Sequence, residues 1–394
     1  MIKVQNMKHD NMKHIRRFGA SIICSFIHNQ ETKKRIYQQI SEFSFFDIPT
    51  LKKFQKTPIN KKSVLLIETN GCHGEVISAY FQYFQDLGYD VDIIMHDFVY
   101  KENHFTRHDI SNINIYHCHQ TAMHKMFQSK KMDRYKAIFI MTPINTANGK
   151  SVLTFFPELN RFKNLYVVAH NLPCIEENYK NFDKKHILGL GRKLGDFPST
   201  NPHSFGKVLK NQTKHTPTTF ITVGRIDPQI KDHSMLISAV QELATKGYNF
   251  RVIIIGGGKK MPNINNDIKK YIVAPGRQIA EKMYRYMEQS DFFLTLWDKN
   301  NPMHDKYRTN LISGSPQLIF GFNKIPIIQK EFADFYDFDK TNAIVYQGDN
   351  LASAMESAIL MKDSEYKKMY NKLDELSKDV YNESLNNLKK ILEK

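Results

Sequence analysis

Short runs of apolar residues alternate with longer amphipathic stretches from residue 61 onward. The run at 63–68 (SVLLIE) is followed by a glycine-containing turn, by apolar side chains at helical spacing over 75–87, and by a second apolar run at 91–95. Short apolar runs are typical of buried strands, and a spacing of about three to four residues is typical of amphipathic helices. The order therefore predicts a β-α-β unit. Further strands are predicted at 113–116, 137–141 and 165–169.

The same alternation begins again in the second half of the chain. Strands are predicted at 218–223, 250–255, 271–273, 292–296, 325–328 and 343–346, and helices at 232–246, 278–289 and 313–320. Alternating strands and helices build a parallel sheet with helices on both faces. We therefore predict an α/β fold with two Rossmann-like domains facing a cleft, where such sheets bind ligands. The expected division is an extension at 1–60, domains at 61–212 and 213–362, and a helical tail at 363–394.

Length and composition agree with this organisation. The 394 residues suffice for two domains, since one domain has about 100–200 residues. With 41% hydrophobic and 24% charged residues the chain has material for packed cores, which argues against intrinsic disorder. The net charge of +16 indicates an anionic partner: a nucleic acid, an acidic membrane surface or a phosphorylated small molecule. Because the sequence shows no zinc module, helix-turn-helix or aromatic-basic strand motif, we do not expect a nucleic acid.

Residues 1–60 stand out as a basic segment, with eleven Lys and Arg against four Asp and Glu. This segment also carries apolar clusters, for example at 43–48. One interpretation is an amphipathic basic helix that binds anionic lipid at a membrane surface. The other is a helical extension that packs on the body of the protein and has a solvated basic face.

The cysteines and the apolar runs indicate in which cellular compartment the protein is expected. Cys24, Cys72, Cys118 and Cys174 lie far apart and form no metal or redox motif, so reduced thiols are expected. The apolar run at 18–27 is too short for a membrane span and no convincing cleavage site follows it, which indicates a retained segment. We expect a cytoplasmic protein that is peripheral on the inner face of the cell membrane if residues 1–60 bind lipid.

Two loops of the first predicted domain carry candidate chemistry at the ends of strands. Gly71, His73, Gly74 and Glu75 follow the first strand, where glycines allow close backbone approach and a helix start offers N–H groups to an anion. The alternative is a turn that only joins strand to helix. His170 follows a later strand and is expected to face the cleft, where imidazole can hydrogen-bond a sugar hydroxyl or orient a leaving group.

A pair of cations marks the start of the second predicted domain. Gly224 and Arg225 follow its first strand, and Lys231 precedes the next helix. A planar guanidinium and a compact ammonium on one loop suit a diphosphate. The alternative is two solvated cations.

Further loops of this domain follow the same logic. Tyr307 precedes Ser313, Gly314 and Ser315, whose hydroxyls and N–H groups at a predicted helix start make a second anion-binding end. Alternatively, Ser313 only caps the helix. The turns that contain Gly256, Gly276 and Arg277 either contact a nucleoside through the backbone or are plain turns.

The order of these motifs resembles that of the GT-B fold glycosyltransferases, in particular the family 4-like group (group 1) of nucleotide-sugar enzymes. The resemblance covers about residues 61–360 and is strongest at Val223-Gly224-Arg225 with Lys231, the pair that this family presents to the nucleotide diphosphate. It implies a catalytic set of His170, Arg225, Lys231 and Glu75. The implied donor contacts are Gly71, His73, Gly74, Gly224, Gly256, Gly276, Arg277, Tyr307, Ser313, Gly314 and Ser315.

The resemblance implies transfer of a sugar from a nucleotide-diphosphate donor to a saccharide or lipid-linked acceptor in surface polysaccharide synthesis. No cofactor and no metal are expected, because Arg225 and Lys231 would stabilise the leaving diphosphate and the sequence shows no metal-ligand spacing. The two glutamates that this family carries eight positions apart are absent around 313–320, so Ser313 and Ser315 are expected to take over part of the donor contact. The alternatives are a GT-B-like sugar-nucleotide epimerase and a non-catalytic membrane-associated binding protein.

Overall fold

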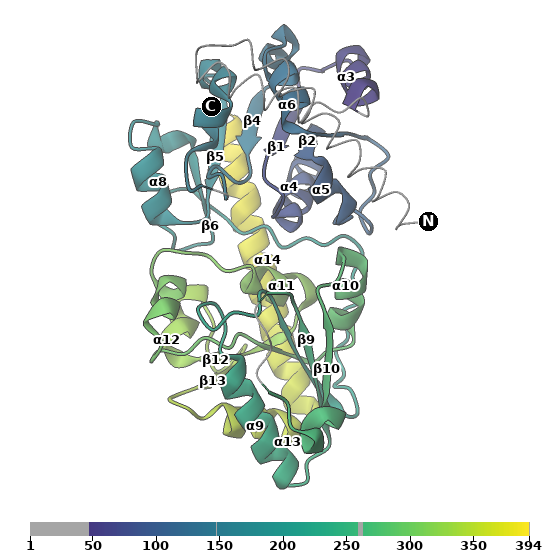
Figure 1. Ribbon diagram of the computed structural model, residues 1–394, viewed down its shortest axis with the longest axis vertical. Coiled ribbons are helices and arrows are strands. Elements are labelled where there is room, and N and C mark those ends of the chain that lie inside the picture. Colours follow the sequence, from purple (N-terminus) through teal and green to yellow (C-terminus); the bar gives the residue numbers. More distant parts are fainter. Residues whose placement is uncertain (1–46, 147, 259–262, 394) are drawn as a thin grey trace, which may run out of the picture.

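Two parallel sheets and one long C-terminal helix organise the chain in the computed structural model (Figure 1). The structure describes residues 47–146, 148–258 and 263–393. Most of the basic segment 1–60, and with it Cys24, therefore lies outside the described residues. The last part of this segment forms α3 (Asp47–Lys56), which buries Phe54 against the first sheet.

The first sheet has seven parallel strands in the order β3-β2-β1-β4-β5-β6-β7. The strands are β1 (Ser63–Glu68), β2 (Asp90–His96), β3 (Ile113–Cys118), β4 (Ala137–Ile140), β5 (Leu165–Ala169), β6 (Ile187–Leu190) and β7 (Ser199–Thr200). The connecting α-helices are α4 (Gly74–Asp86), α5 (Asp97–Lys101), α6 (Gln120–Phe127), α7 (Val152–Phe155) and α8 (Leu172–Asn178). Short 3-10 helices lie at Lys130–Arg134, Pro157–Arg161 and Lys184–His186.

The second sheet has six parallel strands in the order β10-β9-β8-β11-β12-β13. The strands are β8 (Thr218–Val223), β9 (Phe250–Ile255), β10 (Ile272–Gly276), β11 (Phe292–Leu294), β12 (Ile325–Gln329) and β13 (Ile344–Tyr346). The α-helices are α9 (His233–Thr245), α10 (Ala280–Glu288), α11 (Ser315–Phe322), α12 (Lys330–Ala333), α13 (Leu351–Leu360) and α14 (Asp363–Leu392). Short 3-10 helices lie at Asn266–Tyr271, Pro302–Arg308 and Asp334–Tyr336.

Local chemistry explains where these elements begin and end. All six residues of β1 are buried, as expected for a central strand covered on both faces. Helix α9 begins after Asp232, whose carboxylate accepts hydrogen bonds from the backbone N–H groups of Ser234 and Met235 at 2.9 Å each. Helix α11 ends at Asn323, which has a left-handed φ of 52°.

The predicted α/β fold with two Rossmann-like domains is confirmed. Two strands of the first sheet, β6 and β7, were not predicted, because β6 contains Gly189 and β7 has only two residues. Helix α11 begins at Ser315, two residues later than the predicted start, since the Ser313 hydroxyl accepts the N–H of Ser315 at 3.2 Å and holds the turn before it.

The C-terminal segment is one helix of 30 residues, α14, where the sequence predicts a tail of one or two helices. At about 1.5 Å per residue it is about 45 Å long, and Figure 1 shows it running past both sheets. In the second domain Asn323 donates to the carbonyl of Tyr370 at 3.2 Å, and in the first Ser384 accepts from the N–H of Asn201 at 2.9 Å. Despite its length α14 is polar, and no helix among the described residues is long and apolar enough to cross a membrane.

Candidate functional site

A cleft of about 740 Å³ lies between the two domains. The second domain supplies most of its lining, from the loops after β8, β9 and β10 and from the segment that leads into α11. The first domain contributes Glu75, at the start of α4, and Glu102 and His104, just after α5. The cleft therefore opens at the carboxyl ends of the strands of the second sheet, as expected for a parallel α/β sheet.

Ten of the predicted site residues line this cleft. They are Glu75, Gly224, Arg225, Lys231, Gly256, Arg277, Tyr307, Ser313, Gly314 and Ser315. The other five predicted residues, Gly71, His73, Gly74, His170 and Gly276, do not belong to the lining.

Lys231 is the most deeply placed cation of the cleft, with only 2% of its surface exposed. Its Nζ donates to the Thr295 carbonyl at 3.1 Å, to the Ser315 hydroxyl at 3.2 Å and to the Thr222 hydroxyl at 3.3 Å. Burial lowers the pKa of Lys231 to about 7. These three partners are neutral oxygens and do not offset the cost of burying the charge, so an anionic ligand would favour the protonated ammonium.

Arg225 lies on the same loop but near the solvent. Its side chain is 64% exposed, and its Nε is 3.8 Å from a carboxylate oxygen of Asp227. An exposed guanidinium can turn toward a ligand at little cost, whereas Lys231 is held in place by its surroundings. The two cations thus offer one fixed and one adaptable contact to an anion.

Two glycines allow the loops after β8 and β9 to meet at the floor of the cleft. Gly224 has a φ of 143°, and a Cβ there would lie 3.2 Å from the Cε of Lys231. A Cβ on Gly256 would overlap the carbonyl group of Gly224. Both positions therefore require glycine to keep the backbone close to the buried ammonium.

The start of α11 adds hydroxyl groups beside Lys231. The Ser313 hydroxyl lies 3.3 Å from the Ser315 hydroxyl, which in turn contacts the lysine. Tyr307 packs its ring on Trp297 with the ring centres 5.4 Å apart, which fixes the tyrosine at the cleft wall. The N-terminal end of α11 thus faces the same space as the two cations.

His73, Glu75 and His170 form a separate cluster in the first domain. The rings of His73 and His170 are 5.1 Å apart, and His73 Nδ1 is 3.4 Å from the Glu75 carboxylate. Burial opposes the charges of both groups, but hydrogen bonds to Cys72 and Glu75 outweigh it at His73 and raise its pKa well above the ordinary value. The contact with His73 likewise lowers the pKa of Glu75 to about 2. The pair is therefore an imidazolium and a carboxylate.

His170 is the neutral member of this cluster. Burial and the neighbouring charge of His73 lower the pKa of His170 to about 3. Its Nε2 lies 2.6 Å from the carbonyl oxygen of Met141, which can only accept, so Nε2 carries the proton and Nδ1 is an acceptor. The carbonyl of His170 accepts the N–H of Ile312 at 3.1 Å, which ties this cluster to the cleft wall.

The remaining predicted glycines lie outside the cleft lining. Gly74 is buried at the start of α4, where a Cβ would overlap the ring of His104. Gly71 is exposed next to the ring of Phe98, and the carbonyl of Gly276 accepts the N–H of Gly256 at 3.3 Å.

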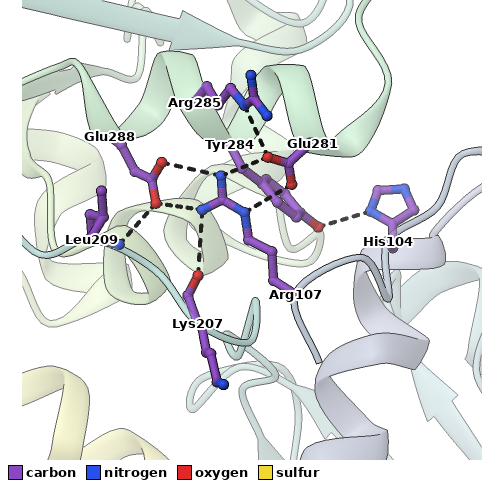
Figure 2. Close-up of polar contacts among 8 residues, drawn as sticks. All are labelled: His104, Arg107, Lys207, Leu209, Glu281, Tyr284, Arg285 and Glu288. Atoms are coloured by element: carbon purple, nitrogen blue, oxygen red, sulfur yellow. Dashed lines mark hydrogen bonds and ion pairs between the residues drawn. The ribbon is translucent and has the colours of Figure 1, made fainter. Parts of the chain in front are cut away.

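Polar contacts hold the two domains together at one end of the cleft (Figure 2). Arg107 of the first domain reaches Glu281 and Glu288 on α10, with its Nε 3.0 Å from Glu281 and its Nη2 3.1 Å from Glu288. Beside it, His104 Nδ1 lies 3.1 Å from the hydroxyl of Tyr284. The first domain is thus fixed to α10 next to the cleft wall.

Glu102, His104 and Arg107 were missed by the sequence analysis. They lie in a loop without a recognisable motif, and their partners are more than 170 residues away in the sequence. Arg277, predicted as a donor contact, pairs with Glu102 and lies with its guanidinium carbon 5.7 Å from the centre of the Phe98 ring. No local pattern could have shown these contacts between domains.

The described residues hold no group of three or more His, Cys, Asp or Glu side chains arranged to bind a metal ion. Cys72, Cys118 and Cys174 are free cysteines in the structure.

Part of the second domain matches a known protein family. Residues 217–297 match the family model of the glycosyl transferases group 1. This segment contains Gly224, Arg225, Lys231, Gly256 and Arg277. No curated protein sequence matches the chain.

Solved structures show the same fold over nearly their whole length. HepE from Anabaena, in complex with UDP, is 10% identical, with 84% of this chain and 99% of HepE covered at a TM-score of 0.52. AviGT4, a glycosyltransferase involved in avilamycin A biosynthesis, is 9% identical, with 83% of this chain and 97% of AviGT4 covered at a TM-score of 0.53. The resemblance to GT-B fold glycosyltransferases is confirmed: the chain has this fold, and its second domain carries the sequence features of the glycosyl transferases group 1.

Proposed function

We propose that the protein is a glycosyltransferase that moves a sugar from a nucleoside diphosphate donor to a saccharide or lipid-linked acceptor of surface polysaccharide synthesis. The observation that carries this proposal is Lys231, which is buried in the cleft and whose Nζ contacts only neutral oxygens among the described residues. A diphosphate would supply the missing negative charge. HepE, which shares the fold, was solved with UDP and with UDP and glucose, which supports a nucleoside diphosphate sugar of the hexose type.

The proposed chemistry rests on electrostatic stabilisation of the leaving diphosphate. Negative charge grows on the diphosphate oxygens as the bond to the sugar breaks, and preorganised cations at that position lower the barrier. Lys231 is held in place by its three oxygen contacts, and Arg225 approaches from the rim. We propose that these two side chains make a metal ion unnecessary.

Residues of the first domain would contact the donor sugar and the acceptor hydroxyl. Because Nε2 of the neutral His170 ring carries the proton, its Nδ1 is an acceptor, which suits a hydroxyl of the donor sugar. Glu75 lines the cleft as a carboxylate and His73 stands beside it, where an acceptor hydroxyl could approach.

The test combines ligand binding with turnover. UDP, GDP and ADP sugars are screened by thermal stabilisation of the full chain, because a ligand at 100 times its Kd stabilises the folded state by about 2.7 kcal/mol. We expect at least one donor to stabilise the wild type, and Lys231→Met and Arg225→Ala to lose this effect and turnover. Arg251→Ala, at an exposed position of β9, is the matched control. Folded variants at positions 225 and 231 with normal turnover would refute the proposal.

We further propose that residues 1–60 bring the enzyme to an anionic membrane surface that carries the acceptor. The support is their basic and apolar composition. Deletion of residues 1–46, which leaves α3 in place, is expected to abolish co-sedimentation with vesicles containing phosphatidylglycerol. Unchanged sedimentation of the deletion variant would show that residues 1–46 are not needed for membrane binding and would contradict this proposal.

A further inference from the structure

The wall of the cleft that the second domain supplies is cationic and contains no carboxylate. Among the described residues of that wall, Arg225, Lys231 and Arg277 are charged, and none is Asp or Glu. The two carboxylates that line the cleft, Glu75 and Glu102, both come from the first domain. Among the described residues, the second domain itself therefore offers a ligand cations and neutral groups, and the carboxylate nearest to this wall is Glu102 of the first domain, which pairs with Arg277.

Helix α11 shows what lies next to the phosphate-binding end of this wall. Ser315 contacts Lys231 at 3.2 Å, and Leu318 follows three residues later and also lines the cleft. Residues three apart are neighbours on one helix face, about 5–6 Å apart. The position one helical turn beyond the ammonium is thus occupied by an aliphatic side chain, with Leu311 and Ile312 also in the lining.

None of the described polar side chains of this wall offers a ligand hydroxyl an ionised acceptor such as a carboxylate. The hydroxyls of Ser313 and Ser315 are engaged with each other and with Lys231. Gln278 donates its amide to the carbonyl of Pro275 at 2.8 Å, and Tyr307 is neutral. A neutral partner contributes less to a hydrogen bond than an ionised one does.

These features determine how a nucleotide would be recognised. In a nucleoside diphosphate the ribose follows directly after the phosphate, at a distance comparable to one helical turn. Rossmann dinucleotide sites read the ribose 2′-hydroxyl with an Asp or Glu. A site built to hydrogen-bond a substrate hydroxyl rejects the analogue without that hydroxyl by up to about 10⁴–10⁵-fold. In this cleft the lining residue one helical turn after Ser315 on α11 is Leu318.

We propose that this site does not read the ribose 2′-hydroxyl, so that its donor class includes 2′-deoxyribonucleoside diphosphate sugars as well as the ribonucleotide forms. This inference rests on the proposed function, because it assumes that Lys231 and Arg225 bind the diphosphate. It concerns the sugar of the nucleotide and not the base.

The decisive experiment compares matched ligand pairs on the wild-type chain. Isothermal titration calorimetry measures Kd for UDP and 2′-deoxy-UDP, for GDP and 2′-deoxy-GDP, and for ADP and 2′-deoxy-ADP. For each base that binds, we expect the two Kd values to agree within about fivefold, the range left by neutral contacts. A deoxy form that binds more than about fivefold weaker would overturn the inference while leaving the proposed function standing. Failure of all six ligands to bind would overturn the proposed function itself, and this inference with it.

A gain-of-discrimination variant tests the role of Leu318. Leu318→Glu places a carboxylate one turn from the phosphate site and is expected to raise the ratio of the deoxy to the ribo Kd at least tenfold, whatever its effect on overall affinity. Leu360→Glu makes the same change at an exposed leucine of α13 and should leave the ratio at the wild-type value. An unchanged ratio in folded Leu318→Glu would show that Leu318 does not face the ribose. If that variant does not fold, the wild-type ligand pairs still decide the question.

Discussion

At the scale of single residues, Lys231 links the stability of the protein to its function. Its ammonium loses hydration on folding and gains only neutral oxygen contacts, which is why burial lowers its pKa from an ordinary 10.5 to about 7. Burial of Lys231 without a counter-charge therefore lowers the stability of the ligand-free protein, although the same burial prepares the side chain to bind an anion.

Replacement of this lysine gives a stability prediction with a defined pH dependence. Between pH 7 and 10.5 the unfolded chain holds the Lys231 proton and the folded chain does not, so the contribution of Lys231 to the free energy of unfolding rises with pH by about 1.4 kcal/mol per unit. Lys231→Met removes this titration. We expect the variant to be more stable than the wild type at pH 7, with a difference that shrinks toward pH 10.

Urea unfolding of both proteins at pH 7, 8, 9 and 10 measures this difference. Lys282→Met, at an exposed position of α10, controls for the loss of a lysine as such. A stability difference between Lys231→Met and wild type that does not change over this range would contradict a buried, deprotonating Lys231.

Gly256 gives a second prediction at this scale. An added Cβ would overlap the backbone of Gly224, so Gly256→Ala must push the two loops apart. We expect a loss of about 1–3 kcal/mol in the free energy of unfolding, together with weaker donor binding. At the adjacent Gly257 the nearest atom to an added Cβ is 3.5 Å away, so Gly257→Ala is a matched control that should change stability little. Equal effects of the two variants would argue against the close loop contact.

The sequence predicted the residues whose role follows from their place in a strand-loop-helix unit. Arg225 and Lys231 belong to the loop between β8 and α9, and Ser313 and Ser315 lie at the start of α11, so local pattern was enough to find them. His104 could not be found in this way, since its partner is Tyr284 in the other domain. Its position depends on how the two domains meet.

At the scale of elements, burial decided what could be predicted. The central strands are continuous apolar runs, because helices cover both faces of each sheet, and β1 and β8 were therefore predicted to the residue. Strand β7 was missed because two residues carry no pattern. For the C-terminal tail at 363–394 the sequence left open whether there is one helix or two, and the structure has the single helix α14, Asp363–Leu392.

Ser384 tests how α14 is attached to the first domain. Its buried hydroxyl accepts the N–H of Asn201 at 2.9 Å, and alanine would leave that N–H without this partner. We expect Ser384→Ala to lower the free energy of unfolding by about 1–3 kcal/mol in urea titrations. Ser364→Ala, at an exposed position near the start of the same helix, should have little effect. Similar losses in both variants would mean that the hydroxyl at 384 contributes nothing specific.

At the scale of the whole molecule, the arrangement of the domains depends on a few contacts between them. Arg107 is the centre of one such group: its side chain is 12% exposed and joins Glu281 and Glu288 of α10 (Figure 2). Without it Glu288 would lose its ion pair with the first domain, and Glu281 would keep only its pair with Arg285 on the same helix. Backbone contacts such as that of Leu172 N–H with the Asn310 carbonyl, at 2.8 Å, and the packing of α14 would remain.

Arg107→Ala is therefore expected to let the cleft open at the α10 side while each domain stays folded. Small-angle X-ray scattering should show a larger radius of gyration than in the wild type, and the donor Kd should rise because Glu102 and His104 move away from the opposite wall. Arg107→Lys keeps the charge but not the planar fork that reaches two carboxylates, so its effect should be intermediate. Arg161→Ala, which removes an exposed ion pair with Asp133 within the first domain, should leave the scattering unchanged. If Arg107→Ala scatters like the wild type at low and high salt alike, Arg107 is not needed to hold the domains together. The cleft walls are then positioned by the packing of α14 and by the other contacts between the domains, such as those of Leu172 with Asn310 and of His104 with Tyr284.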